Sequence, residues 1–147
     1  SNKTRAIAEN FAWVHSVDRL KIAQRLSMQR PTSAPPLNVC IEVNVSGETS
    51  KSGVSPGALA VLAEQVAALP QLKLRGLMAI PAPTSDLQQQ RAAFARVRVL
   101  FDALNQRGLN LDTLSMGMSG DLEAAIAEGA TIVRIGTAIF GVRETLK

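Results

Sequence analysis

Residues 114–141, LSMGMSGDLEAAIAEGATIVRIGTAIFG, decide the fold class of this chain. Two apolar runs, 111–116 and 131–135, each end in a turn of small residues, and a helical stretch over 121–128 joins them. Strands that alternate with helices predict a parallel sheet with right-handed crossovers. The two turns would then lie side by side at the carboxyl edge of the sheet, where α/β folds bind ligands.

The residues in these two turns suit a phosphate group. Ser119 and Gly120 follow the first run, and Gly136 and Thr137 follow the second. Bare backbone N–H groups, hydroxyls and a helix N-terminus are what a bound phosphate requires. Ordinary βα turns use the same residue types, because glycine adopts positive φ and serine caps helices. On spacing alone, the ordinary turn is the favoured interpretation.

The remaining sequence continues the alternation of strands and helices. Three further strands are predicted at 11–16, 37–45 and 72–80, between helices at 2–10, 18–29, 56–69 and 85–108. Ser55 and Pro56 mark one helix start, because serine caps helices and proline fits the first helical turn. The 147 residues hold five strands in one domain. A complete (β/α) barrel needs eight strands and roughly 250 residues, so the pattern alone predicts an open doubly wound sheet or a fragment.

Composition and charge exclude several classes of protein. The net charge of +4 comes from scattered basic residues, and aromatic residues make up 3% of the chain, so a nucleic-acid partner is not expected. No apolar run is long enough to cross a bilayer, so a membrane partner is not expected either. The single cysteine, Cys40, lies in an apolar run and is predicted to be a small buried side chain. Its isolation favours a cytoplasmic location.

Three polar residues stand out within apolar surroundings. Arg134 interrupts the run 131–135, and a buried guanidinium needs acceptors, so either an ion pair or a ligand is expected beside it. Asn44, near the end of the run 37–45, could face a binding site or cap the following turn. His15 has no cysteine or second histidine to accompany it, so we interpret it as structural and expect no metal site.

Four segments together resemble the pyridoxal phosphate homeostasis protein family, a relative of the alanine racemase barrel. These segments are NKTRAIAENFAWVHSVDRL, LNVCIEVNVSGETSKSG, LKLRGLMAIPAP and the stretch 114–141. The resemblance implies a TIM-type (β/α)8 barrel that binds pyridoxal 5′-phosphate (PLP). It also implies that this chain holds the last five βα units, without three amino-terminal strands and the Schiff-base lysine that they carry. The barrel rule agrees, because phosphate sites favour the loops after strands seven and eight.

The resemblance also assigns roles to individual residues. It places the phosphate on Ser119, Gly136 and Thr137, the pyridine nitrogen beside Arg134, and the ring near Met78 and Met118. It implies a homeostatic PLP carrier without robust catalysis, no catalytic or metal-binding residues in this chain, and a monomeric full-length relative. A racemase-like PLP enzyme and an inert barrel fragment are the alternatives. A chain of this kind could self-associate through its open sheet edges.

Overall fold

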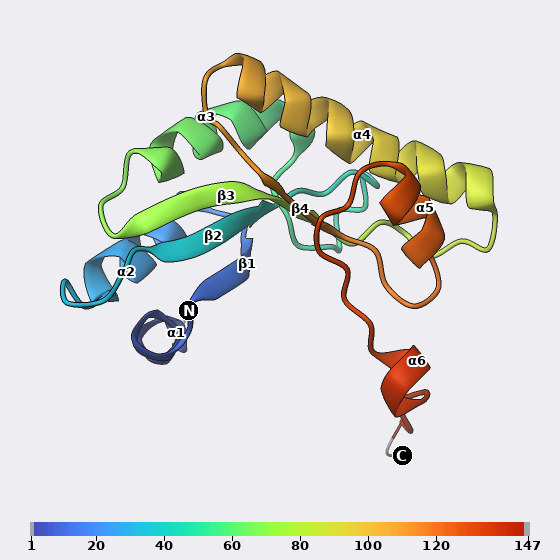
Figure 1. The fold of residues 1–147 in the computed structure, drawn as a ribbon, viewed down its shortest axis with the longest axis horizontal. Coiled ribbons are helices and arrows are strands. Elements are labelled where there is room, and N and C mark those ends of the chain that lie inside the picture. Colours follow the sequence, from blue (N-terminus) through green and yellow to red (C-terminus); the bar gives the residue numbers. More distant parts are fainter. Residues whose placement is uncertain (1, 146–147) are drawn as a thin grey trace.

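The computed structural model describes residues 2–145, which form a parallel four-stranded sheet with helices around it (Figure 1). The strands are β1 (Trp13–Val17), β2 (Leu37–Glu42), β3 (Leu72–Ala79) and β4 (Thr113–Met116). The helices are α1 (Thr4–Asn10), α2 (Leu20–Gln29), α3 (Pro56–Ala67), α4 (Leu87–Gln106), α5 (Leu122–Ala127) and α6 (Thr137–Phe140). In the described residues, no helix is long and apolar enough to cross a membrane. The predicted parallel α/β class is confirmed.

The strand order is β1-β2-β3-β4, so every strand pairs with the next one in sequence. A doubly wound sheet reverses its strand order at a switch point and carries helices on both faces. Here the order does not reverse, and each helix from α1 to α5 packs against the next, which makes one continuous helical layer. The doubly wound alternative raised by the sequence pattern is therefore wrong.

The two faces of the sheet differ in chemistry. Side chains on the helix-covered face form the hydrophobic core, and examples are Val39 and Ile41 of β2 and Leu77 of β3, all fully buried. Alternate positions on the same strands carry polar groups instead, such as Glu42 on β2 and Ser115 on β4. Successive residues of a strand point to opposite faces, so this alternation gives the sheet one apolar and one polar face.

The fifth predicted strand, 131–135, is not formed. In its place, Ile132 makes an isolated parallel bridge to Ser115, and the Arg134 N–H donates to the Gly117 carbonyl at 2.9 Å. The backbone pairing of this segment with β4 stays short of a regular ladder, and no strand lies on its other side within residues 2–145. The prediction of five strands is corrected to four strands and one bridged segment.

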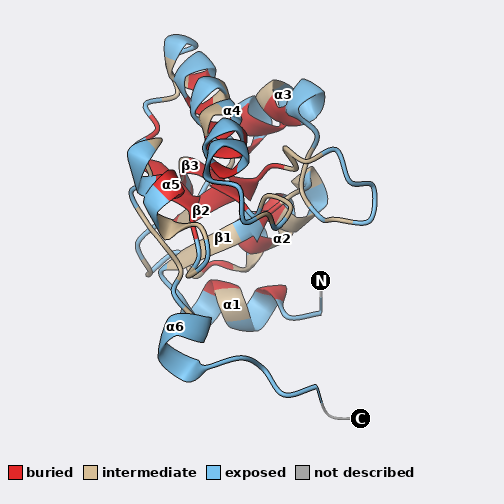
Figure 2. Cartoon of the chain, turned by 90° about the vertical axis from the view of Figure 1, so that its right-hand side faces the viewer, coloured by how far each residue is buried: buried red, intermediate tan, exposed pale blue. Residues whose placement is uncertain are grey.

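The carboxyl-terminal part of the described chain projects away from the body (Figures 1 and 2). On α6, Ile139 and Phe140 are 67% and 84% exposed. Exposed apolar clusters of this kind drive association. We therefore expect reversible self-association, and we expect the double substitution Ile139→Ser with Phe140→Ser to shift the protein towards monomer.

Sedimentation velocity over a range of concentrations tests this expectation. Ile126→Ser is the matched control, because Ile126 is also exposed but lies on α5, within the folded body. An unchanged concentration dependence in the double variant would move the association surface elsewhere, with the open edge of β1 as the next candidate.

Candidate functional site

The two small-residue turns meet in space, as the sequence predicts. Ser119 lies in the turn after β4, and Ala138 lies in α6 after the second turn. The Ser119 hydroxyl accepts a hydrogen bond from the Ala138 backbone N–H at 3.1 Å. This contact joins residues far apart in the sequence and brings Gly136 and Thr137 beside Ser119.

The turn that carries Ser119 is closed by its own hydrogen bonds. The Asp121 Oδ1 accepts from the Met118 N–H at 2.7 Å, and the Asp121 N–H donates to the Met118 carbonyl at 3.2 Å. At the second turn, a Cβ added to Gly136 would meet no atom within 4 Å, so that side of the backbone is open. A fixed first turn beside an open second turn is suited to an anion that contacts backbone groups directly.

Arg134 has a buried donor without an acceptor. Its Nη2 donates to the Ala79 carbonyl at 3.0 Å, whereas its buried Nε has no hydrogen-bond partner within the described chain. Burial lowers the pKa of the guanidinium, and the nearby Glu42 and Asp121 carboxylates raise it in part. No carboxylate lies within ion-pair distance of Arg134 among residues 2–145. An ion pair is one explanation that the sequence offers for Arg134, and the described residues contain no such pair.

His15 and Ser115 form a polar pair on the same face of the sheet as Glu42. The His15 Nδ1 lies 2.8 Å from the Ser115 hydroxyl, although β1 and β4 are opposite edge strands of the sheet. Burial lowers the pKa of His15, and the Arg134 charge lowers it further. A neutral imidazole beside a guanidinium avoids placing two positive charges together.

Glu42 is a buried polar residue near Arg134 that the sequence analysis did not single out. It is buried at the end of β2, and its Oε1 accepts from the Ser52 hydroxyl at 3.3 Å. Burial raises the pKa of the Glu42 carboxyl, and the Ser52 hydrogen bond and Arg134 only partly oppose this rise. The sequence could have indicated this residue, because Glu42 is a charged residue within an apolar strand, as Arg134 is within the apolar run 131–135.

The raised pKa of Glu42 predicts a pH-dependent stability. The folded state binds the proton more tightly than the unfolded state, so stability is highest below the unfolded pKa of ~4.3 and falls as the pH rises through the folded pKa. Glu42→Gln is expected to remove this loss and to raise the Tm at pH 7 by about 2–4 °C, the effect of ~1 kcal/mol in a domain of this size.

Thermal unfolding at pH 4 and pH 7 is the measurement, and Glu123→Gln on the exposed surface of α5 is the control. The two glutamine variants should differ from each other at pH 7 and converge at pH 4. An equal Tm for both at pH 7 would show that Glu42 carries no burial penalty.

A comparison with known proteins identifies the family. The family model described as alanine racemase, N-terminal domain, matches residues 1–144. The chain belongs to this family. It is similar to the pyridoxal phosphate homeostasis protein of Pseudomonas aeruginosa, with 70% identity over 98% of the chain and 61% of that protein. The protein of the same name from Escherichia coli is 56% identical over 100% of the chain and 63% of that protein.

A solved relative carries the cofactor. PipY of Synechococcus elongatus, with PLP bound, superimposes with a TM-score of 0.85 at 37% identity, over 95% of this chain and 66% of that one. The chain thus spans less than two thirds of the length of these three relatives. The resemblance read from the sequence motifs is confirmed at the level of family.

The remaining predicted residues of this family member fall in different places. Met78 is buried on the polar face of the sheet, where it pairs with Glu42 and Ser115 across the strands. Met118 is 43% exposed and lies beside the Ser119 turn. Asn44 caps its turn, because its side chain donates to the Glu48 carbonyl and accepts from the Ser46 N–H.

Cys40 and the metal-ligating side chains are also candidate reactive groups in the sequence. Cys40 is buried, and burial raises the pKa of its thiol to about 12, so it stays protonated and unreactive at neutral pH. No group of three or more metal-ligating side chains occurs among residues 2–145.

Proposed function

We propose that this chain binds PLP, with the phosphate held between the Ser119 turn and the Gly136–Thr137 turn and the ring beside Arg134. The observation that carries the proposal is the buried Arg134 Nε without an acceptor, next to two turns suited to phosphate. A pyridine nitrogen is an acceptor and would satisfy this donor, since an unpaired buried donor is costly. PLP binding by PipY and the names of the relatives support the same ligand.

The residues around this site favour holding PLP over driving catalysis with it. Bound PLP supplies an aldehyde and an electron-accepting ring. Arginine is only a donor and stays protonated, so Arg134 would leave the pyridine nitrogen unprotonated and the ring a weak electron acceptor. Met78 and Met118 would pack near the ring. The chain also has no tyrosine, which removes one common acid/base partner for racemisation.

We infer a homeostatic role in the cytoplasm, as carrier or regulator of PLP, with the chain acting as part of a (β/α)8 barrel. The sequential strand order and the single helical layer support the barrel, because consecutive barrel strands are arranged in this way. In such a barrel the Schiff-base lysine would come from the first strand, outside this chain. The names of the relatives, homeostasis proteins and not enzymes, support the role.

The test is isothermal titration of the chain with PLP and with pyridoxal, which lacks the phosphate. PLP is expected to bind at least about tenfold more tightly, because each charge-assisted hydrogen bond to the phosphate contributes ~1.5–3 kcal/mol. Equal affinities would refute the phosphate site. A parallel assay of D-alanine formation should show no turnover above that of free PLP, and clear turnover would favour the racemase alternative.

A further inference from the structure

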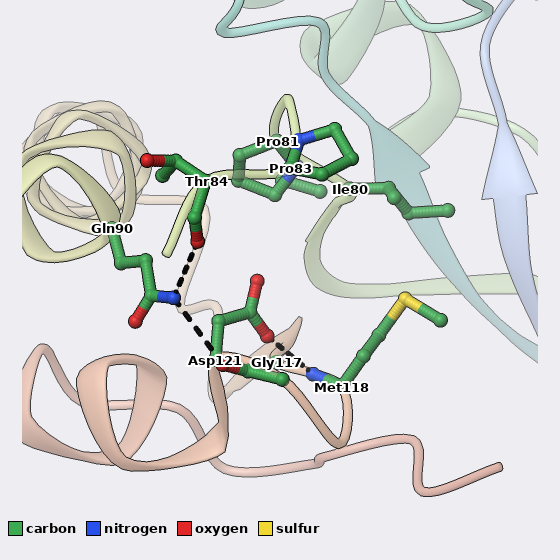
Figure 3. A pocket seen from close by; sticks show the side chains of 10 residues that line it. Ile80, Pro81, Pro83, Thr84, Gln90, Gly117, Met118 and Asp121 are labelled. Atoms are coloured by element: carbon green, nitrogen blue, oxygen red, sulfur yellow. Dashed lines mark hydrogen bonds between the residues drawn. The ribbon is translucent and has the colours of Figure 1, made fainter. Parts of the chain in front are cut away.

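A cavity lies beside the turn that follows β4, and Gly117, Met118 and Asp121 of that turn line it (Figure 3). It has a volume of about 210 Å³ between the segment after β3 and the turn after β4. Ile80 and Met118 face each other across it, and Pro81 and Pro83 add further apolar wall. Gln90 closes the side towards α4, where its amide donates to the Thr84 and Gly120 carbonyls at 2.7 and 3.2 Å. The cavity therefore has apolar walls and a backbone that is fixed in place.

Asp121 is the one charged residue among those that line this cavity. Its Oδ1 accepts from the Met118 N–H at 2.7 Å, and Figure 3 shows its other carboxylate oxygen directed towards the prolines. One oxygen of the Asp121 carboxylate is therefore held by the backbone, and the other faces the cavity. A carboxylate against apolar walls attracts a cation that has an apolar body.

The charged and apolar residues of the lining indicate which kind of cation would fit the cavity. The lining includes no lysine or arginine, and the nearby Arg134 guanidinium donates to the Ala79 carbonyl, so a ligand that carries its own carboxylate, such as an amino acid, would find no basic side chain in the lining. The apolar walls suit a hydrocarbon body better than a hydrated metal ion. We propose that this cavity binds a small primary amine, with its ammonium group on Asp121 and its hydrocarbon part against Ile80, Pro83 and Met118.

The amine site and the phosphate turn share a backbone segment. Gly120 and Asp121 line the cavity, and Ser119 immediately precedes them in the same turn. Occupation of the cavity would therefore change the affinity of the Ser119 turn for phosphate, and linkage requires that phosphate change the amine affinity by the same factor. This coupling rests on the proposed function, whereas amine binding itself does not.

The experiment is a titration of the ¹⁵N-labelled chain with isobutylamine, without PLP, followed by amide shifts of Gly117, Met118 and Gly120. Isobutanol serves as the neutral analogue. Asp121→Asn should weaken amine binding by about tenfold, the loss of a charge-assisted interaction. The asparagine carboxamide oxygen can still accept from the Met118 N–H, so the turn is retained. Glu123→Gln is the matched control, since it removes an acid two residues away that does not line the cavity.

Three results of this titration would contradict the proposed amine site. Absence of shifts, equal affinity for amine and alcohol, or equal effects of the two variants would each overturn the proposal. If Asp121→Asn does not fold, added salt is the second measurement, and it should weaken amine binding to the unaltered chain but leave isobutanol unaffected. A final titration with inorganic phosphate, with and without amine, tests the coupling. Loss of phosphate binding there would refute the phosphate site and leave the amine result standing.

Discussion

Gly76→Ala is expected to destabilise the chain by about 3 kcal/mol or more and to disrupt the pairing of β3 with β4. A Cβ at Gly76 would lie 1.7 Å from the Thr113 carbonyl oxygen and 2.6 Å from its carbonyl carbon. These are backbone atoms of the neighbouring strand, at the position where Gly76 pairs with Thr113. No side-chain rotation can relieve such an overlap, so β4 must move, and the Ser119 turn that follows β4 must move with it.

Urea denaturation monitored by circular dichroism measures the loss, and Gly57→Ala is the matched control. Gly57 lies in the first turn of α3, and a Cβ there would meet no atom within 4 Å. The control should be neutral or slightly stabilising, because alanine is the better helix former by up to ~1 kcal/mol. If both variants unfolded at the same urea concentration, the close approach of β3 and β4 would not exist in solution.

Thr137→Val is expected to weaken PLP binding by about 10–100-fold and to leave the fold nearly unchanged, since one charge-assisted hydrogen bond contributes ~1.5–3 kcal/mol. Thr137 is exposed at the first position of α6, beside the Ser119 turn. Valine keeps the branched shape of threonine but removes the hydroxyl that would donate to the phosphate. The loss should therefore appear in the affinity for PLP and not in the Tm.

Two comparisons make this prediction specific. Pyridoxal, which has no phosphate, should bind Thr137→Val and the unaltered chain equally well. Thr49→Val, which changes an exposed threonine in the loop after β2, should leave PLP affinity unchanged. Calorimetric titration of all three proteins provides the measurement. An unaltered dissociation constant for PLP in Thr137→Val would place the phosphate elsewhere.

Local sequence signals determined four of the five predicted strands, the helices between them and the two turns. Ser55 and Pro56 predicted a helix start, and α3 begins at Pro56 with Ser55 at the N-cap position. The Ser55 side chain makes no capping hydrogen bond, so the fixed φ of proline at the first helical position is the local signal that holds. Cys40 was predicted to be buried and is buried. The turns at Ser119 and at Gly136–Thr137 were predicted to be neighbours, since parallel strands end at the same edge of a sheet, and the Ser119–Ala138 hydrogen bond joins them.

Only the tertiary structure decided the strand order, the partners of each buried polar group and the cavity. Sequence alternation fits both a doubly wound sheet and a sequentially wound one, because the direction in which each crossover returns depends on packing between distant elements. The segment 131–135 has a strand-like composition but makes only an isolated bridge to β4, and pairing is not a property of one segment. Arg134, Glu42 and Asp121 were all visible as charges in the sequence. Whether a charge has a partner depends on distances across the fold, which residue types alone do not determine.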